Sequence, residues 1–358
     1  MRKKIVGMLT TATLLTMAVA GNVQAAEIRS VGPDGEAAVD ASTIELTDDQ
    51  IAQIKEGGYT AAICLHYGGN DWSTSQQKGL EDTFGELGIE IVAVTDANFS
   101  AETQVSNIET VMAKKPDILV SIPTDATATA DAYKQAAAAG IKIVFMDQRA
   151  NGLEAGKDYV SVVSADNYGN GYASGTVLGD ALGGKGKVAM VYYDANFAPT
   201  NQRDEGFRDA MKNYPDIEIV TEQGFTDESG CAEQGDAILT QFPNIDGIYA
   251  SWDVPMEGVL SAVRAAGMEG KVTLACNDLG NNVAREIASG NIAGGGAQMP
   301  YDQGVAEAKL AALALLGEET PSYVAVPAET VTHENVLEAY TDVYHVETPD
   351  WLKEAYVE

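Results

Sequence analysis

Short apolar runs alternate with longer amphipathic stretches along most of the chain. Gly88 and Gly140 stand where two of the amphipathic stretches should end, and each is followed at once by an isoleucine that begins an apolar run. This alternation predicts parallel strands joined by right-handed helical crossovers. In this first part the expected strands are 60–66, 89–94, 117–122 and 141–146, and the expected helices are 73–87, 101–115 and 126–139.

The same pattern restarts further along, which predicts a second unit of similar design. A chain of 358 residues also exceeds the usual size of one domain. The expected fold class is therefore α/β, with two doubly wound parallel-sheet lobes. In the second unit the expected strands are 187–193, 217–221, 246–250, 272–276 and 292–297, and the expected helices are 202–213, 229–241, 254–266 and 279–288.

Other segments fall between or outside these units. A short strand and a helix-like stretch occupy 159–182, and a last helix and strand, 301–316 and 323–326, return most simply to the first unit. A helix at Asp48–Glu56 is expected, with a capping box formed by Thr47 and Gln50. We expect a signal peptide at 1–25, an N-terminal extension at 26–58, lobe 1 at 59–165 plus 299–326, lobe 2 at 166–298, and a tail at 327–358 that packs on the lobes.

The first residues have the features of a secretory signal. Arg2, Lys3 and Lys4 precede a short apolar run, and Val23-Gln24-Ala25 resembles a cleavage site. No later run is apolar enough to span a bilayer. We therefore expect a mature protein that is free in the periplasm.

Charge and motifs exclude several function classes. The net charge of −31 disfavours nucleic acids and anionic membranes as partners. The cysteines, Cys64, Cys231 and Cys276, are odd in number and predict buried thiols, and the three histidines have no metal-ligand spacing. The chain lacks a phosphate loop, a dinucleotide-binding motif and a nucleophile elbow. We expect no catalytic residue, no metal and no cofactor.

Hydrogen-bonding and aromatic residues follow one predicted strand after another. The carboxyl ends of parallel strands are where ligands bind in open α/β sheets. Carboxylates accept hydrogen bonds from hydroxyls, Arg, Asn and Gln can donate them, and aromatic faces pack on C–H groups. Each residue alone could instead cap a helix, fill the core or pair on the surface. Together they predict a site for a neutral, hydroxyl-rich small molecule, and they are Asn70, Trp72, Asp147, Gln148, Arg149, Arg203, Phe225, Trp252, Asn277, Asp278 and Gln298.

The stretch GGNDW at 68–72 lies between the first strand and the first helix of lobe 1. Asn70 offers hydrogen bonds to a ligand, and Trp72 offers an apolar face. Asp71 is expected to point away from the ligand and to cap the following helix, for which Ser73 or Thr74 is a further candidate cap.

Six stretches in this order resemble the ribose/galactose-type periplasmic binding proteins, the type I solute receptors of sugar ABC transporters. The resemblance covers about 59–327. The stretches are ILVSIPTDATA at 118–128, VFMDQRA at 144–150, SADNYGNG at 164–171, QRDEGF at 202–207, ACNDLG at 275–280 and AQMPYDQG at 297–304.

The resemblance implies a ligand held between two lobes that close on it. It places the crossings between lobes near Ala165–Asp166, Gln298–Met299 and Val326–Ala328. The chain departs from the ribose receptor at two positions. Gln148 stands where an arginine is expected, with Arg149 one place later. Trp252 stands where an asparagine is expected. The sugar-contacting positions that it implies are Asn70, Trp72, Asp147, Gln148, Arg203, Trp252, Asp278 and Gln298, with Phe225 aligned less securely.

Three functions remain open at this point. The first is a monomeric receptor that captures a sugar or polyol by hinge closure and delivers it to a membrane ABC permease. The second is a sensory receptor that presents a furanosyl signal molecule to a membrane kinase. The third is a secreted sugar-modifying enzyme in which Asp147 and Asp278 are paired carboxylates. Neighbouring genes for a permease and ATPase, or for a kinase, would separate the first two, and turnover of a bound sugar would indicate the third.

Overall fold

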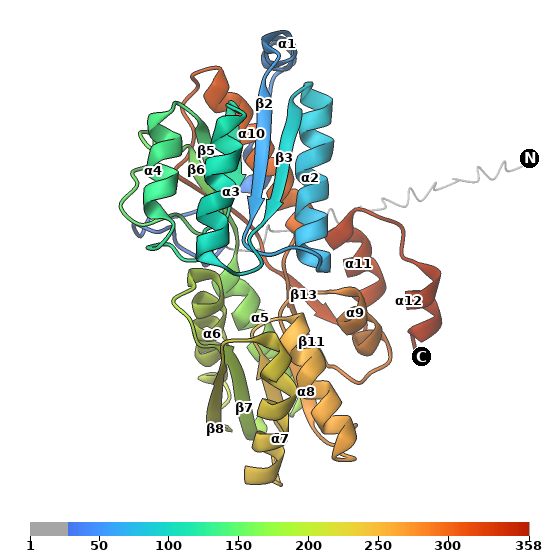
Figure 1. Ribbon diagram of the computed structural model, residues 1–358. Helices are drawn as coiled ribbons and strands as arrows, with labels where there is room; N and C mark the ends of the chain where they lie inside the picture. The colour runs from blue at the N-terminus through green and yellow to red at the C-terminus, as the bar shows by residue number, and fades with distance from the viewer. Residues whose placement is uncertain (1–27, 358) are drawn as a thin grey trace, which may run out of the picture.

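The computed structural model describes residues 28–357, which form two lobes, one above the other in Figure 1. The expected signal peptide lies outside the described residues. The first lobe holds a seven-stranded sheet in the order β1-β12-β6-β5-β4-β2-β3, and every neighbouring pair is parallel. Its strands are β1 (Val39–Asp40), β2 (Thr60–Leu65), β3 (Glu90–Asp96), β4 (Ile118–Ser121), β5 (Lys142–Met146), β6 (Ser161–Ala165) and β12 (Tyr323–Val326).

The second lobe holds a six-stranded sheet in the order β13-β11-β10-β9-β7-β8. All its neighbours are parallel except β13, which pairs antiparallel with β11 at one edge. The expected α/β class, with two mainly parallel sheets, is confirmed. The strands are β7 (Lys185–Tyr193), β8 (Asp216–Phe225), β9 (Gly247–Ala250), β10 (Thr273–Cys276), β11 (Gly294–Ala297) and β13 (Glu329–Thr332).

Helices cover both faces of each sheet (Figure 1). The helix expected at 202–213 begins earlier, at Ala198. Proline has no backbone N–H, and the first turn of a helix makes no use of that group, so Pro199 is accommodated there. No helix within residues 28–357 has the length and apolar character needed to cross a membrane. The helices are α1 (Asp48–Gly57), α2 (Asp71–Leu87), α3 (Ala101–Ala113), α4 (Ala130–Ala138), α5 (Asn167–Ala181), α6 (Ala198–Met211), α7 (Cys231–Gln241), α8 (Asp253–Ala265), α9 (Asn281–Ala288), α10 (Pro300–Leu315), α11 (Val336–Tyr344) and α12 (Asp350–Ala355).

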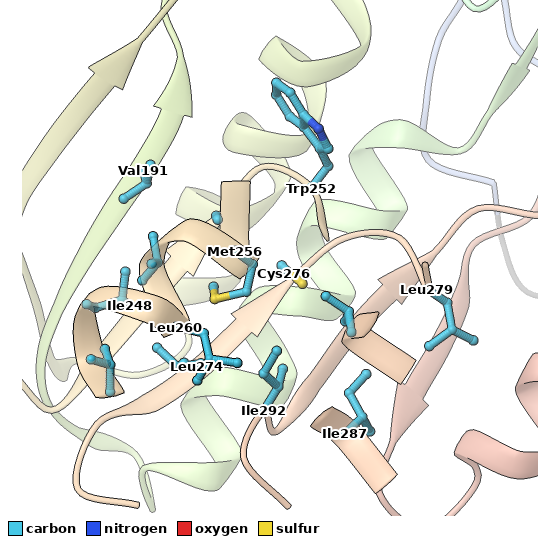
Figure 2. Packing of buried hydrophobic residues seen from close by; sticks show 14 of the residues in the cluster. Val191, Ile248, Trp252, Met256, Leu260, Leu274, Cys276, Leu279, Ile287 and Ile292 are labelled. Atoms are coloured by element: carbon cyan, nitrogen blue, oxygen red, sulfur yellow. The ribbon is translucent and has the colours of Figure 1, made fainter. Parts of the chain in front are cut away.

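The hydrophobic core of each lobe lies on both faces of its sheet. Along β2, Ile63 and Leu65 join one cluster of buried side chains, while Ala62 and Cys64 join the cluster on the opposite face. This is the period of two that a strand imposes, and it explains why strands buried on both faces appear as unbroken apolar runs. Figure 2 shows the corresponding packing in the second lobe, with Trp252 at the margin of the cluster.

Within the described residues, the chain passes between the sheets three times. These passages join β6 to α5, β11 to α10, and β12 to β13. The carboxyl ends of β5, β7 and β10 therefore face the space between the lobes, which is where a ligand site is expected in such sheets.

The two terminal segments pack on different lobes. In the N-terminal segment, β1 pairs with β12, and the capping box of Thr47 and Gln50 on α1 is confirmed. In the C-terminal segment, β13 extends the second sheet, and Val336 and Leu352 are buried in the core of the second lobe.

Glycines allow α5 and α6 to lie unusually close together. A Cβ on Gly171 would stand 1.8 Å from the carbonyl oxygen of Arg203, and one on Gly206 would stand 2.1 Å from the carbonyl oxygen of Tyr168. A side chain larger than hydrogen fits at either position only if the helices move apart. The contact fixes α6, and with it Arg203, against the start of α5.

Candidate functional site

A cavity lies between the lobes, where the carboxyl ends of strands from both sheets meet. Its empty space, including the part open to solvent, is about 450 Å³. Loops after β2, β3, β4 and β5 contribute from the first lobe, and β7, α6 and the loops after β9, β10 and β11 contribute from the second. The lining residues are His66, Tyr67, Trp72, Phe99, Ile122, Asp147, Tyr193, Phe197, Pro199, Thr200, Arg203, Trp252, Asp278 and Gln298.

The polar part of the cavity centres on a buried ion pair. Nη1 of Arg203 lies 3.1 Å from Oδ2 of Asp278, and the two side chains are only 6% and 9% exposed. Nε of Arg203 donates to Oδ1 of Asn167 at 2.9 Å, and Nε2 of Gln298 donates to Oδ1 of Asp278 at 2.8 Å. Because each partner is held by another group, the guanidinium has a fixed position and orientation.

Asp147 supplies a second carboxylate from the first lobe. Its Oδ1 accepts hydrogen bonds from Ser164 Oγ at 3.1 Å, from the Ala165 amide at 3.3 Å and from Gln303 Nε2 at 3.3 Å. Burial raises the pKa of Asp147, and Arg203 acts against that rise. The carboxyl group is thus oriented by the first lobe and electrostatically coupled to the second.

Both cavity aspartates have a left-handed backbone. The φ angles of Asp147 and Asp278 are 52° and 69°. This region is uncommon for residues other than glycine, and such strain is concentrated at ligand sites. At both positions the turn directly after the strand aims the carboxylate into the space between the lobes.

Aromatic rings form the rest of the wall. From the first lobe, the rings of Tyr67 and Phe99 stack with their centroids 4.2 Å apart. From the second lobe, Tyr193 meets Trp252 edge to face at 5.6 Å. The ring of His66 stacks on Phe197 across the lobes, with 5.6 Å between centroids. Burial lowers the pKa of His66 to about 3, so this ring is neutral and acts as part of the aromatic wall.

Six of the eleven sequence-predicted residues line this cavity: Trp72, Asp147, Arg203, Trp252, Asp278 and Gln298. Phe225 lies behind the wall, with its ring 5.1 Å from that of Trp252. It therefore supports an aromatic residue of the cavity and is not itself part of the lining.

The remaining four predicted residues make structural contacts beside the cavity. Asn277 is buried and donates from Nδ2 to the Tyr249 hydroxyl and the Ser251 carbonyl. Asn70 is the N-cap of α2, with Oδ1 accepting from the Ser73 amide. Gln148 donates from Nε2 to the Pro123 carbonyl and accepts from the Ala198 amide across the lobes. Arg149 turns away, toward Asp34 at 2.7 Å.

The expectation for the start of α2 was wrong. Neither Asp71 nor Ser73 nor Thr74 is the N-cap, because Asn70 takes that position. Asp71 instead reaches the second lobe, where its carboxylate accepts hydrogen bonds from Asn281. Asn70 and Asp71 are adjacent and both can accept hydrogen bonds, so the sequence does not indicate which of them caps the helix.

Sequence reasoning missed much of the aromatic wall. His66 and Tyr67 end the apolar run of β2, Tyr193 ends β7, and Phe197 begins the turn into α6. Their position at strand ends is the signal that could have found them, since it is the signal that found Trp252. Among residues 28–357, no group of three or more His, Cys, Asp or Glu is placed to hold a metal ion.

Comparisons with known proteins agree with this geometry. Residues 61–319 match the family described as periplasmic binding protein domain. The D-ribose/D-allose-binding protein of Pseudomonas aeruginosa is 29% identical over 273 residues, covering 73% of this chain and 83% of its own length.

Two solved structures share the fold. An ABC transporter periplasmic solute-binding protein from Actinobacillus succinogenes with bound D-allose is 29% identical, with a TM-score of 0.72 over 78% of this chain and 99% of that one. A solute-binding protein from Agrobacterium vitis bound with α-D-tagatopyranose is 25% identical, with a TM-score of 0.74 over 82% of this chain and 100% of that one. With its family match, its two parallel-sheet lobes and a cavity at their strand ends, the chain belongs to the periplasmic binding protein family.

Proposed function

We propose that this protein is a periplasmic receptor that binds a sugar or polyol between its lobes and delivers it to an ABC transporter permease. The observation that carries the proposal is the ion pair of Arg203 and Asp278, held at the lobe junction opposite Asp147 and enclosed by aromatic rings. Charged donors and acceptors with fixed orientations suit hydroxyl groups, and aromatic faces suit the C–H side of a sugar ring.

The relatives support the same choice. The structures from Actinobacillus succinogenes and Agrobacterium vitis were solved with a bound aldohexose and a bound ketohexose. The named relative from Pseudomonas aeruginosa is a sugar-binding protein, and none of these names describes an enzyme.

Each side chain of the cavity has a role in this proposal. Arg203 donates to ligand oxygens, Asp147 and Asp278 accept from hydroxyls, and Gln298 completes the polar edge. Trp72 and Trp252 pack on the ligand from opposite lobes. Asn70, Gln148, Arg149 and Phe225 hold the walls in place. The lobes close as a hinge, and ligand shifts the population toward the closed form.

The remaining parts of the proposal concern location and partners. Residues 1–25 would be removed on secretion, and the mature protein would act as a monomer in the periplasm. The permease would recognise the closed pair of lobes.

The test is calorimetric titration of the purified protein with a panel of pentoses, hexoses, inositols and sugar alcohols. We expect one saturable ligand, and about a hundredfold excess over its Kd should stabilise the fold by about 2.7 kcal/mol. Arg203→Ala should abolish measurable binding, because it removes the central donor and leaves the buried Asp278 without a charged partner.

Arg208→Ala is the matched control. Arg208 lies on the same helix but pairs with Glu222 on the surface, so binding should be unchanged. If Arg203→Ala binds as well as wild type, the assigned site is wrong. If no sugar or polyol binds to wild type, the proposed function is wrong.

A further inference from the structure

Most polar atoms of the cavity already have protein partners. Arg203 uses Nε on Asn167 and Nη1 on Asp278 and the Ser251 carbonyl. Asp278 accepts one hydrogen bond on each oxygen, from Arg203 and from Gln298. The hydroxyl of Thr200 donates to the Phe197 carbonyl. The polar edge can therefore serve only a few ligand hydroxyls.

The two cavity tryptophans differ in their indole nitrogens. Nε1 of Trp252 donates to Oε1 of Glu228 at 2.9 Å. Nε1 of Trp72 is buried and has no hydrogen-bond partner among the described residues. Gln298 Oε1 and His66 Nδ1 are buried and without partners in the same part of the chain. Buried polar atoms normally have hydrogen-bond partners. Unpartnered polar atoms on residues that line a ligand cavity therefore mark where a polar group of the ligand belongs.

Apart from these polar atoms and the hydroxyls of Tyr67 and Tyr193, the rest of the lining is mainly aromatic and aliphatic. Seven of the 14 lining residues are aromatic rings, counting the neutral His66, and Ile122 and Pro199 are aliphatic. A hydroxyl placed against the faces of these rings or against the aliphatic side chains would lose its water without gaining a hydrogen bond. Each such hydroxyl should weaken binding by roughly fivefold to a hundredfold.

We propose that the preferred ligand is a deoxy sugar. It would carry a cluster of hydroxyls that face Arg203, Asp147, Asp278 and Gln298, a single polar group near Trp72, and a methyl or methylene group against the aromatic rings. The inference rests on the proposed function and narrows its ligand class. A fully hydroxylated hexopyranose carries a hydroxyl on nearly every carbon, which exceeds what this lining can pair.

The test compares deoxy sugars with their hydroxylated parents by calorimetric titration of the purified protein. The pairs are D-fucose with D-galactose, L-rhamnose with L-mannose, and 2-deoxy-D-ribose with D-ribose. In at least one pair we expect the deoxy sugar to bind at least about tenfold more tightly than its parent. If in every pair the parent binds as tightly or more tightly, the deoxy-sugar inference is overturned and the sugar receptor stands. If no sugar or polyol binds at all, both proposals fail.

A variant pair tests the role given to Trp72. Trp72→Phe keeps an aromatic ring and removes the indole N–H, so the affinity for the preferred sugar should fall by roughly fivefold to a hundredfold. Trp351→Phe is the control, because Trp351 lies on α12 beside Arg285 and Tyr340, outside the cavity. Equal affinities for both variants and wild type would show that Trp72 Nε1 does not contact the ligand.

Discussion

Asp71 in the first lobe and Asn281 in the second are joined by two hydrogen bonds. Oδ2 of Asp71 accepts from the backbone N–H of Asn281 at 2.7 Å, and Oδ1 accepts from its side-chain amide at 2.8 Å. Each residue is the first of its helix, α2 or α9. A carboxylate at the start of a helix is favoured by the exposed N–H groups there. This contact can form only when the lobes are together, so it stabilises the closed form.

Removing this contact should shift the lobes toward the open form. We expect Asp71→Ala to weaken ligand binding by about threefold to thirtyfold, through faster dissociation of the ligand. Hydrogen bonds to a charged group contribute about 1.5–3 kcal/mol, and the partial exposure of Asp71 reduces that contribution. Stopped-flow binding kinetics would measure the effect. Asp131→Ala, at the exposed start of α4, is the control and should bind like wild type. An unchanged dissociation rate in Asp71→Ala would exclude a role for the contact in closure.

The C-terminal segment takes part in the same contact. The hydroxyl of Tyr340 on α11 donates to Oδ1 of Asn281 at 2.5 Å and so orients the amide toward Asp71. Tyr340→Phe removes only this hydroxyl and should raise the dissociation rate in the same direction as Asp71→Ala, by a smaller factor. In the double variant the two effects should not add, since both act through Asn281. Additive effects would show that Tyr340 acts elsewhere.

The fold could be predicted from the sequence because its main determinants are local. The alternation of apolar runs with amphipathic stretches identified the strands of both sheets except the edge strands β1 and β13. Parallel strands end at one edge of their sheet, which is why Asp147 and Asp278 could each be proposed as a site residue. That the two sheets face one ligand was implied by the family resemblance. The family resemblance rests on the same strand ends.

The direction of individual side chains could not be predicted in the same way. Gln148 and Arg149 follow Asp147 directly, and the tight turn there, with Gln148 N–H bonded to the Met146 carbonyl, sends each to a different partner. Asn70 and Asp71 are equally able to cap a helix, and only the position of Asn281 in the second lobe distinguishes them. Such choices depend on tertiary contacts that periodicity does not encode.

The close approach of α5 to α6 should be essential for the position of Arg203. In Gly171→Ala the new Cβ would meet the Arg203 carbonyl oxygen at 1.8 Å, so α6 must move. We expect a loss of about 1–3 kcal/mol in the free energy of unfolding, together with weaker ligand binding. Thermal or denaturant unfolding and calorimetric titration would measure the two effects.

Gly85→Ala is the matched control for that substitution. Gly85 is also helical, in α2, but a Cβ there would meet nothing within 4 Å. This variant should be more stable than wild type by up to about 1 kcal/mol, because alanine has the higher helix propensity. If Gly171→Ala binds ligand with wild-type affinity, Arg203 tolerates movement of α6.

Asp204, next to Arg203 on α6, should make the stability of the protein depend on pH. Its Oδ1 accepts a hydrogen bond from Ser251 Oγ at 2.6 Å, and burial raises its pKa to about 7. The unfolded chain has the ordinary value of about 3.9. The folded state therefore holds the proton more tightly, and the stabilisation from this group is complete below pH of about 4 and is lost as the pH rises to about 7.

Asp204→Asn removes the ionisable group and should change this dependence. The variant should gain stability over wild type as the pH rises, by an amount on the order of a few kcal/mol between pH of about 4 and about 7. Denaturant unfolding of both proteins at pH 5 and pH 8 would measure this gain in stability from the shift of the unfolding midpoint. Asp209→Asn on the same helix is the control, because ion pairing with Lys212 lowers the pKa of Asp209 and the substitution should give no gain at either pH. If Asp204→Asn differs from wild type in stability by the same amount at both pH values, Asp204 does not titrate between them.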